Sequence, residues 1–342
     1  MSALRALTPR RLLTAGLVLL VAAALLLLFK KSDRLLEVPD DAHALSGVVS
    51  IPGTKAQSDP GGIYYVDVLV QRASLLQATF PFTRPEGADL IPEEAFVPSG
   101  LTYNQQIKLE AENMKVSQEK AAVVALRALG YKVPAREAGV RVIDVERDSH
   151  AYGVLRAQDV VVAADGKPVR NRADLFQVMS KHRVGDTVRI GVLRGRKRLT
   201  LRIRTIADSS DAKRPIIGFI PFETLKARLP FDVNFNLNRD VGGPSAGLAF
   251  ALEVMEARGR DVDHGLKIAA TGEIGLDGKV GSIGGVKQKT IGARQSHVDA
   301  FLVPVDGDNA KDARRYAHGL RIIPVKTFQQ ALRALATLAR KA

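Results

Sequence analysis

The stretch DVGGPSAGLAFALEVMEA, Asp240 to Ala257, joins a glycine-rich turn to an apolar helix. Gly242 and Gly243 permit a tight backbone path, and Pro244 favours the first turn of a helix. Ser245 is then expected at a helix N-terminus, where unsatisfied N–H groups and the positive end of the helix dipole can hold an oxyanion. An ordinary helix cap in a Gly-Pro turn explains the same residues equally well. The segment thus makes Ser245 a candidate nucleophile but does not indicate which residue would act as its general base.

The sequence offers lysine as that base. It contains no cysteine, which excludes a thiolate nucleophile, thiolate metal sites and a disulfide framework. None of the six histidines lies in a segment typical of a His-Asp-Ser arrangement: His43, His150, His182, His264, His297 and His318. The segment ATGEIGLDGKVGSIGGVKQKTIGA, Ala270 to Ala293, predicts a strand, a hairpin and the start of a helix that carries Lys287 and Lys289.

Together these two segments resemble the proteolytic domain of Lon proteases, in which G-P-S-A-G, T-G-E-I and G-G-hydrophobic-K-x-K follow in this order. The resemblance covers roughly residues 215–338. It implies that Ser245 is the nucleophile, that Lys289 is the general base, and that Thr271 supports and orients the lysine. Gly243 and Pro244 would then form the oxyanion turn.

Three details refine this resemblance. Lys287 would lie on the wrong face of its helix to act as the base. Many Lon enzymes carry an acidic residue three before the serine, where this chain has Gly242; whether Asp240 substitutes is left open. Lon proteases proper also carry an ATPase module, which requires G-x-x-x-x-G-K-[ST], and the sequence contains no such string. We therefore expect peptide hydrolysis without ATP.

The region between Gly139 and Thr205 is rich in short predicted strands, with a hairpin turn at Asp165-Gly166 and one helix near residues 173–180. It resembles the PDZ domains of bacterial exported proteases, which bind an extended peptide beside an open strand edge. The matching residues are Gly139, Val140, Val142, Val145, Ser149, Ala151, Leu155, Asp159, Val160, Gly166 and Val169. Gln158 departs from the glycine that is common there. The segment VPAREAG is the candidate carboxylate loop; a spacer without a ligand is the alternative.

The N-terminal region predicts a membrane anchor. Leu12 to Phe29 is uncharged and apolar over about the 20 residues that a bilayer core requires of a helix. A cleaved signal peptide is the alternative, but small residues lie inside the apolar run and lysines follow it. Ser32 to Ala42 is expected to be a linker, and Ser117 is expected to cap a helix that ends near Tyr131.

The basic composition raises the question of nucleic-acid binding. A net charge of +14 would favour nucleic-acid binding, but Lys and Arg are spread along the chain and no recognised nucleic-acid motif accompanies them. We therefore expect that the protein does not bind nucleic acid. We also expect no cofactor and no metal. A homo-oligomer is an open possibility.

These observations predict an α+β protein with four parts. Residues 1–31 would be a cytoplasmic tail and transmembrane helix, 32–130 a juxtamembrane region of unassigned role, 131–207 a small β-rich PDZ-like domain, and 215–342 a Lon-type proteolytic domain. The resemblance to bacterial membrane-anchored PDZ-Lon proteases implies a single-pass protein of the cell membrane with an extracytoplasmic catalytic domain. Its partners would be protein or peptide substrates and the membrane. The alternative is a catalytically silent, membrane-tethered peptide-binding scaffold.

Overall fold

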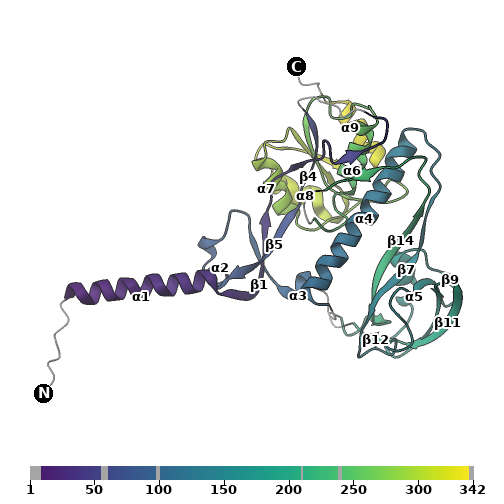
Figure 1. The fold of residues 1–342 in the computed structure, drawn as a ribbon, viewed down its shortest axis with the longest axis horizontal. Coiled ribbons are helices and arrows are strands. Elements are labelled where there is room, and N and C mark those ends of the chain that lie inside the picture. Colours follow the sequence, from purple (N-terminus) through teal and green to yellow (C-terminus); the bar gives the residue numbers. More distant parts are fainter. Residues whose placement is uncertain (1–8, 55–60, 98–100, 209–210, 238–240, 339–342) are drawn as a thin grey trace.

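The computed structural model describes residues 9–54, 61–97, 101–208, 211–237 and 241–338. It is a mixed α+β structure with two packed bodies and a projecting N-terminal helix (Figure 1). One body contains a five-stranded sheet and most of the helices, and the other is rich in β-strands. The long helix α4 (Tyr103–Ala128) lies between them.

The sheet of the first body has the strand order β2-β4-β16-β19-β20. Its strands are β2 (His43–Ala44), β4 (Gly62–Tyr65), β16 (Lys267–Ala270), β19 (Ala300–Pro304) and β20 (Arg321–Val325). The last four run parallel, and β2 is antiparallel to β4. A parallel sheet of this kind needs helices on both faces, because both faces must be kept from water.

Successive side chains of β16 point to opposite faces of the sheet, and different helices cover each face. Ile268 and Ala270 pack in a core that includes α4, α6 (Gly247–Ala257) and α9 (Phe328–Ala336). Ala269 points to the opposite face, in a core with α7 (Val286–Gln295) and α8 (Asn309–Tyr316). The helix expected after Ser245 and the helix expected to carry Lys287 and Lys289 are therefore present, as α6 and α7.

The segment before α4 belongs to the same body. Strand β4 pairs with β16 in register, with Ile63 opposite Ile268, so residues near 63 supply an inner strand of the sheet. The expected linker at residues 32–42 is wrong, because β1 (Lys31–Pro39) is the central strand of a second sheet, between β5 (Val68–Ser74) and β6 (Asp89–Pro92). Leu35 and Leu36 are fully buried there, which explains why this polar segment is ordered as a strand.

Helix α4 begins fifteen residues earlier than the sequence predicts. Its N-cap is Thr102, whose hydroxyl accepts from the N–H of Gln105 in a capping box. Ser117 is therefore not a cap but a buried residue inside the helix, and the cap prediction is wrong.

The β-rich body has the strand order β11-β10-β8-β7-β14. The strands are β7 (Ala135–Val145), β8 (Val160–Ala164), β10 (Thr187–Arg194), β11 (Lys197–Arg204) and β14 (Phe219–Ala227), with β9 (Lys167–Pro168) beside β8 and helix α5 (Arg172–Met179). It has its own hydrophobic core. The predicted hairpin turn is present, since Asp165 and Gly166 both have positive φ, at 46° and 78°.

This β-rich body is an insertion into the first one. It leaves after α4 and returns before α6, and its two ends are neighbours: Ala135 pairs with Ala227, and the N–H of Arg228 donates to the carbonyl of Pro134 at 2.9 Å. The first body is thus built from two stretches of chain, one on either side of the insertion.

The remaining described elements are short. They are β3 (Val49–Ser50) with β15 (Asn234–Phe235), β12 (Ile206–Ala207) with β13 (Pro215–Ile216), β17 (Glu273–Ile274) with β18 (Val280–Gly281), α2 (Leu75–Thr79), α3 (Glu93–Phe96) and the 3₁₀ turns η1 (Pro81–Thr83) and η2 (Asp306–Asp308).

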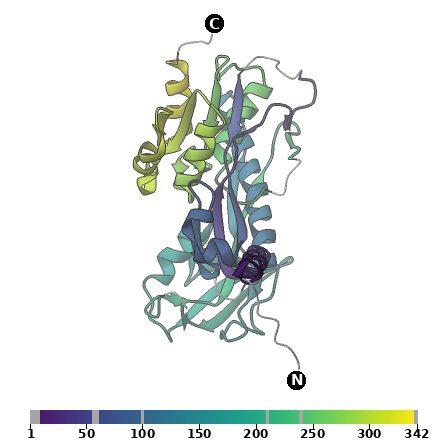
Figure 2. The same ribbon diagram turned by 90° about the vertical axis from the view of Figure 1, so that its left-hand side faces the viewer.

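Helix α1 (Pro9–Phe29) projects away from both bodies in Figure 1 and is seen end-on in Figure 2. Among the residues that the structure describes, no helix is both long enough and apolar enough to cross a membrane. The structure therefore gives no support to the predicted transmembrane helix.

Candidate active site

Ser245 lies in a turn that ends where α6 begins. Gly243 has φ +87°, a conformation that favours glycine, and Pro244 follows it. The helix itself starts at Gly247, where an added Cβ would lie 2.8 Å from Ser117 Oγ and 2.9 Å from a carbon of Ile274. The turn therefore depends on Gly243 for its backbone angle and on Gly247 for close packing.

Two neighbouring segments hold this turn in place. The carbonyl of Ser245 accepts from Thr271 Oγ1 at 3.1 Å and from the N–H of Gly272 at 2.7 Å, both at the end of β16. On the other side, Ser117 Oγ of α4 donates to the carbonyl of Pro244 at 2.9 Å. Thr271 thus supports the nucleophile's backbone through this bond, whereas the resemblance implied that it orients the lysine.

Lys289 comes from the first turns of α7, whose N-cap is Gly285 in the left-handed conformation. Its Nζ lies 2.8 Å from Ser245 Oγ, within hydrogen-bond distance. Lys287 points elsewhere, because its Nζ forms an ion pair with Asp89 Oδ1 at 2.7 Å. The structure therefore brings Ser245 and Lys289 together and leaves Lys287 outside the pair.

The environment of Lys289 makes its neutral form more accessible than that of a lysine in water. The side chain is buried, with only 4% of its surface exposed. Burial lowers the pKa of Lys289 from 10.5 to about 8, although the carboxylates of Asp67, Glu273 and Glu37 oppose this shift by favouring the ammonium form. An amine with this pKa is partly neutral near pH 7 to 8 and can accept a proton from a hydroxyl.

The proposed oxyanion role of Gly243 and Pro244 requires correction. The N–H of Gly243 donates to the carbonyl of Glu110 at 2.8 Å, and proline has no N–H to give. These residues shape the turn but supply no oxyanion donor. The N–H groups of Ser245 and Ala246 are better candidates, since they lie at the start of α6, where backbone N–H groups lack acceptors within a helix.

Glu110 of α4 packs against the glycines that precede the nucleophile. An added Cβ at Gly242 would lie 2.6 Å from the Cβ of Glu110, and one at Gly243 would lie 3.2 Å from its Oε2. A side chain at position 242 would therefore displace Glu110, which explains the glycine where many Lon enzymes have an acidic residue. Asp240, the other candidate for that role, lies outside the described residues.

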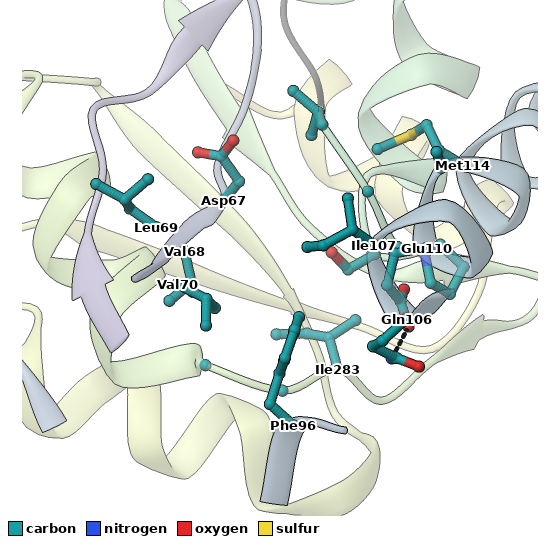
Figure 3. A pocket seen from close by; sticks show the side chains of 18 of the residues that line it. Asp67, Val68, Leu69, Val70, Phe96, Gln106, Ile107, Glu110, Met114 and Ile283 are labelled. Atoms are coloured by element: carbon teal, nitrogen blue, oxygen red, sulfur yellow. Dashed lines mark hydrogen bonds between the residues drawn. The ribbon is translucent and has the colours of Figure 1, made fainter. Parts of the chain in front are cut away.

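Ser245 and Lys289 open into a pocket of about 890 Å³. Helix α4 forms one wall, with Ile107, Glu110 and Met114, and the segment Asp67 to Val70 forms another (Figure 3). The pocket is large enough for several residues of an extended peptide. Val68 to Val70 belong to β5, which is an outer strand of its sheet among the described strands.

Among the described residues, two groups of side chains have possible metal-ligand atoms within 4.8 Å of one another. In the first group, Asp40 and Asp67 line the pocket, and His43 Nε2 lies 3.3 Å from Asp40 Oδ2 and 3.5 Å from Asp67 Oδ1. The second group is Glu256, Asp261 and Asp263, at and just beyond the C-terminal end of α6, the end opposite Ser245.

Sequence comparisons identify two domains in the chain. Residues 127–205 match the PDZ domain family, and residues 239–337 match the Lon protease (S16) C-terminal proteolytic domain. The second match contains Ser245, Thr271 and Lys289. The resemblance to a Lon-like protease that also carries a PDZ domain is therefore confirmed, and the proteolytic domain is of the serine peptidase class.

Curated relatives match the C-terminal part of the chain. Lon protease 2 of Bacillus subtilis is 38% identical over 101 residues, which are 29% of this chain and 18% of the relative. The mitochondrial Lon protease homolog of Drosophila melanogaster is 46% identical over 71 residues, 20% of this chain and 6% of the relative. The chain thus spans less than a fifth of the length of the Lon proteases that it matches.

Among solved structures, the PDZ domain of the SdrC-like protein from Listeria monocytogenes is 30% identical. The match covers 25% of this chain and 87% of that domain, with a TM-score of 0.23.

The PDZ domain does not present the strand edge that the sequence suggested. The VPAREAG segment runs into β7, and β7 is flanked by β8 on one side and β14 on the other. Glu137 pairs with Leu225 and Val140 with Glu223, so β14 covers the edge proposed for the peptide. The outer strand on this side, among the described strands, is β14.

Proposed function

We propose that this protein is an ATP-independent serine endopeptidase that uses Ser245 and Lys289 as a catalytic dyad. The 2.8 Å distance between Lys289 Nζ and Ser245 Oγ, with the amine buried, carries this proposal. A serine hydroxyl is a weak nucleophile until an adjacent base removes its proton, and a buried lysine is suited to do so.

The reaction begins when neutral Lys289 takes the hydroxyl proton as Ser245 Oγ attacks the peptide carbonyl. The N–H groups of Ser245 and Ala246 donate to the developing oxyanion. The lysine ammonium then gives its proton to the leaving amine, and an acyl-enzyme remains on Ser245. Water attacks this ester after losing a proton to Lys289, and the proton returns to Ser245 Oγ as the acid is released.

Thr271, Gly272 and Ser117 act as positioning residues in this scheme. They hold the carbonyls of Ser245 and Pro244 and thereby fix the direction of the nucleophile. A displacement of about 1 Å at such a turn can cost a hundredfold in rate, because the reacting atoms must meet in one geometry.

The proposed independence from ATP rests on the sequence, which contains no phosphate-cradling G-x-x-x-x-G-K-[ST] string. Hydrolysis of a short peptide should therefore proceed at the same rate with and without ATP and magnesium.

We further propose that the PDZ domain selects protein substrates by binding an exposed tail. PDZ domains add a peptide as an extra strand, and the outer position of β14 and the packing of α5 near it support this mode. The PDZ domain's separate core supports a role in recognition apart from the chemistry.

Attachment to the cell membrane through α1, with the proteolytic domain outside the cytoplasm, is a further part of the proposal. The apolar run in the sequence supports it, as do the exposed large apolar side chains on α1, which include Leu13, Leu17, Leu20, Leu26 and Phe29. Carbonate extraction of cell membranes tests the attachment, and protease treatment of intact cells tests the orientation.

The decisive experiment is hydrolysis of an unfolded protein by the purified full-length chain, beside its Ser245→Ala variant. Cleavage that the variant lacks would support the peptidase. Equal, residual cleavage by both proteins would assign it to a contaminant and favour the silent scaffold.

A further inference from the structure

We infer that the pocket beside Ser245 accepts a cationic side chain of the substrate, lysine or arginine, and that Glu110 is the carboxylate that contacts it. This inference rests on the proposed peptidase function and adds a substrate class to it.

The first observation is a reversal of charge at the pocket. The chain as a whole carries a formal net charge of +14. Five carboxylates nevertheless line this one pocket: Glu37, Asp40, Asp67, Glu110 and Glu273, of which Asp40 and Asp67 both contact His43. An acidic cleft in a basic protein attracts cationic ligands and disfavours anionic ones.

The cations near the pocket do not cancel this charge. Lys289 is one of three lysines that line the pocket, and the five carboxylates outnumber them even when every lysine is charged. Lys115 is paired with Glu112 at 2.6 Å, and Arg172 lies 3.7 Å from Glu223. The third lysine of the pocket lining, Lys108, is an exposed side chain. The carboxylates therefore exceed the positive charges available to them.

Glu110 is the carboxylate best placed to meet a substrate next to the scissile bond. It lies against Gly242 and Gly243, directly before the nucleophile, and its carbonyl is bonded to the turn. Gln106 Nε2 donates to its Oε1 at 2.7 Å, which fixes the direction of the carboxylate. The side chain is half-buried, so a cation bound there would be attracted in a poorly hydrated site.

The walls around Glu110 suit the stem of such a side chain. Ile107 and Met114 come from the same helix, while Val70 and Ile283 lie across the pocket (Figure 3). Lysine and arginine bury their methylene groups on apolar surface and keep the charged end at a polar group. A leucine would fill the same walls but leave the half-buried carboxylate without a cationic partner, and a glutamate would be repelled.

A scanning peptide set tests the inference. One neutral, unstructured peptide is prepared with lysine moved through each position around its cleavage site, and with leucine or glutamate at the same positions. We measure kcat/KM for the full-length protein, for Glu110→Gln, and for Glu119→Gln. The last variant is a matched control, since Glu119 lies on the same helix, is exposed and does not line the pocket.

We expect lysine at one position to raise kcat/KM at least about tenfold over leucine and further over glutamate. Glu110→Gln should reduce the lysine-to-leucine ratio by about tenfold, while Glu119→Gln leaves it unchanged. A ratio near one at every position of the scan, or a ratio that Glu110→Gln does not reduce, would overturn the inference.

Binding of the same peptides to Ser245→Ala separates this inference from the proposed function. If no peptide is hydrolysed, the peptidase proposal fails, and the affinity of lysine over leucine peptides for this variant still decides the inference. If all peptides are cut and bound alike, the peptidase proposal is supported and the inference of a specificity for cationic side chains is wrong.

Discussion

Lys289 and Ser245 are 44 residues apart in the sequence, and their side chains meet at 2.8 Å between Nζ and Oγ. The serine comes from the turn before α6 and the lysine from the first turns of α7. Both segments are fixed to the central sheet, through the end of β16 and through the core beneath α7. This contact defines the first prediction.

Ser245→Ala and Lys289→Ala should each abolish peptide hydrolysis, with a loss of at least about a thousandfold, because each removes one half of the proton transfer. Lys287→Ala should keep most of the activity, since its amine is paired with Asp89. Initial rates on a short peptide, with circular dichroism as the folding control, provide the measurement. An inactive Lys287→Ala beside an active Lys289→Ala would reverse the assignment of the base.

The rate should rise with pH and level off above about pH 8. The base acts in its neutral form, and burial lowers the pKa of Lys289 to about 8, so below that pH most molecules carry the inactive ammonium. Glu37→Gln removes a carboxylate that favours the ammonium form, and it should move the profile of kcat/KM to lower pH. Glu86→Gln is the control, because that carboxylate pairs with Arg294 and does not line the pocket. A shift to higher pH in Glu37→Gln would contradict the electrostatic argument.

Lys289→Met should abolish activity and stabilise the fold. The pKa of Lys289 is lowered from 10.5 to about 8 in the folded state, so at pH 7 the buried ammonium costs up to about 3 kcal/mol, which methionine removes. The gain should shrink as the pH rises from 8 to 10.5, because the native lysine then loses its proton. Urea denaturation at pH 7 and at pH 10 measures this. Lys287→Met, which only breaks an ion pair, should not stabilise.

Ser117→Ala should lower kcat more than its modest cost in stability would suggest. The substitution removes the hydrogen bond to the carbonyl of Pro244 and loosens the turn that carries the nucleophile. We expect a loss of about 1 kcal/mol in stability and on the order of tenfold in kcat, with KM for a short peptide little changed. Ser149→Ala is a matched control, because Ser149 also donates to backbone carbonyls, but within the PDZ domain. Equal rates for both variants would show that Ser117 has no role in positioning.

Replacing residues 136–226 with a two-residue Asn-Gly turn should spare short-peptide hydrolysis and reduce cleavage of a protein with a free tail. The structure favours this deletion, because Ala135 and Ala227 are cross-strand partners and the domain has its own core. The ratio of the two rates is the measurement. Equal loss on both substrates would mean that the domain holds the catalytic body together, and unchanged rates would make it a spacer.

Much of the candidate site could be predicted from the sequence because its motifs are local. The Gly-Gly-Pro-Ser sequence favours a turn followed by a helix start, and the spacing of Lys287 and Lys289 on one helix permits only one of them to face the serine. The Asp165-Gly166 hairpin was predictable for the same reason, since both residues tolerate positive φ.

The sequence by itself thus determined the nucleophile turn, the two lysine positions and the presence of two kinds of domain. Tertiary structure alone decided that residues near Ile63 supply an inner strand of the proteolytic sheet, that β14 covers the edge of β7, and that Glu110 and Ser117 reach the nucleophile from α4. The physical reason is that hydrogen bonds and packing act on distance in space. A glutamate more than a hundred residues before its glycine neighbour leaves no local pattern, so only the folded chain brings the two together.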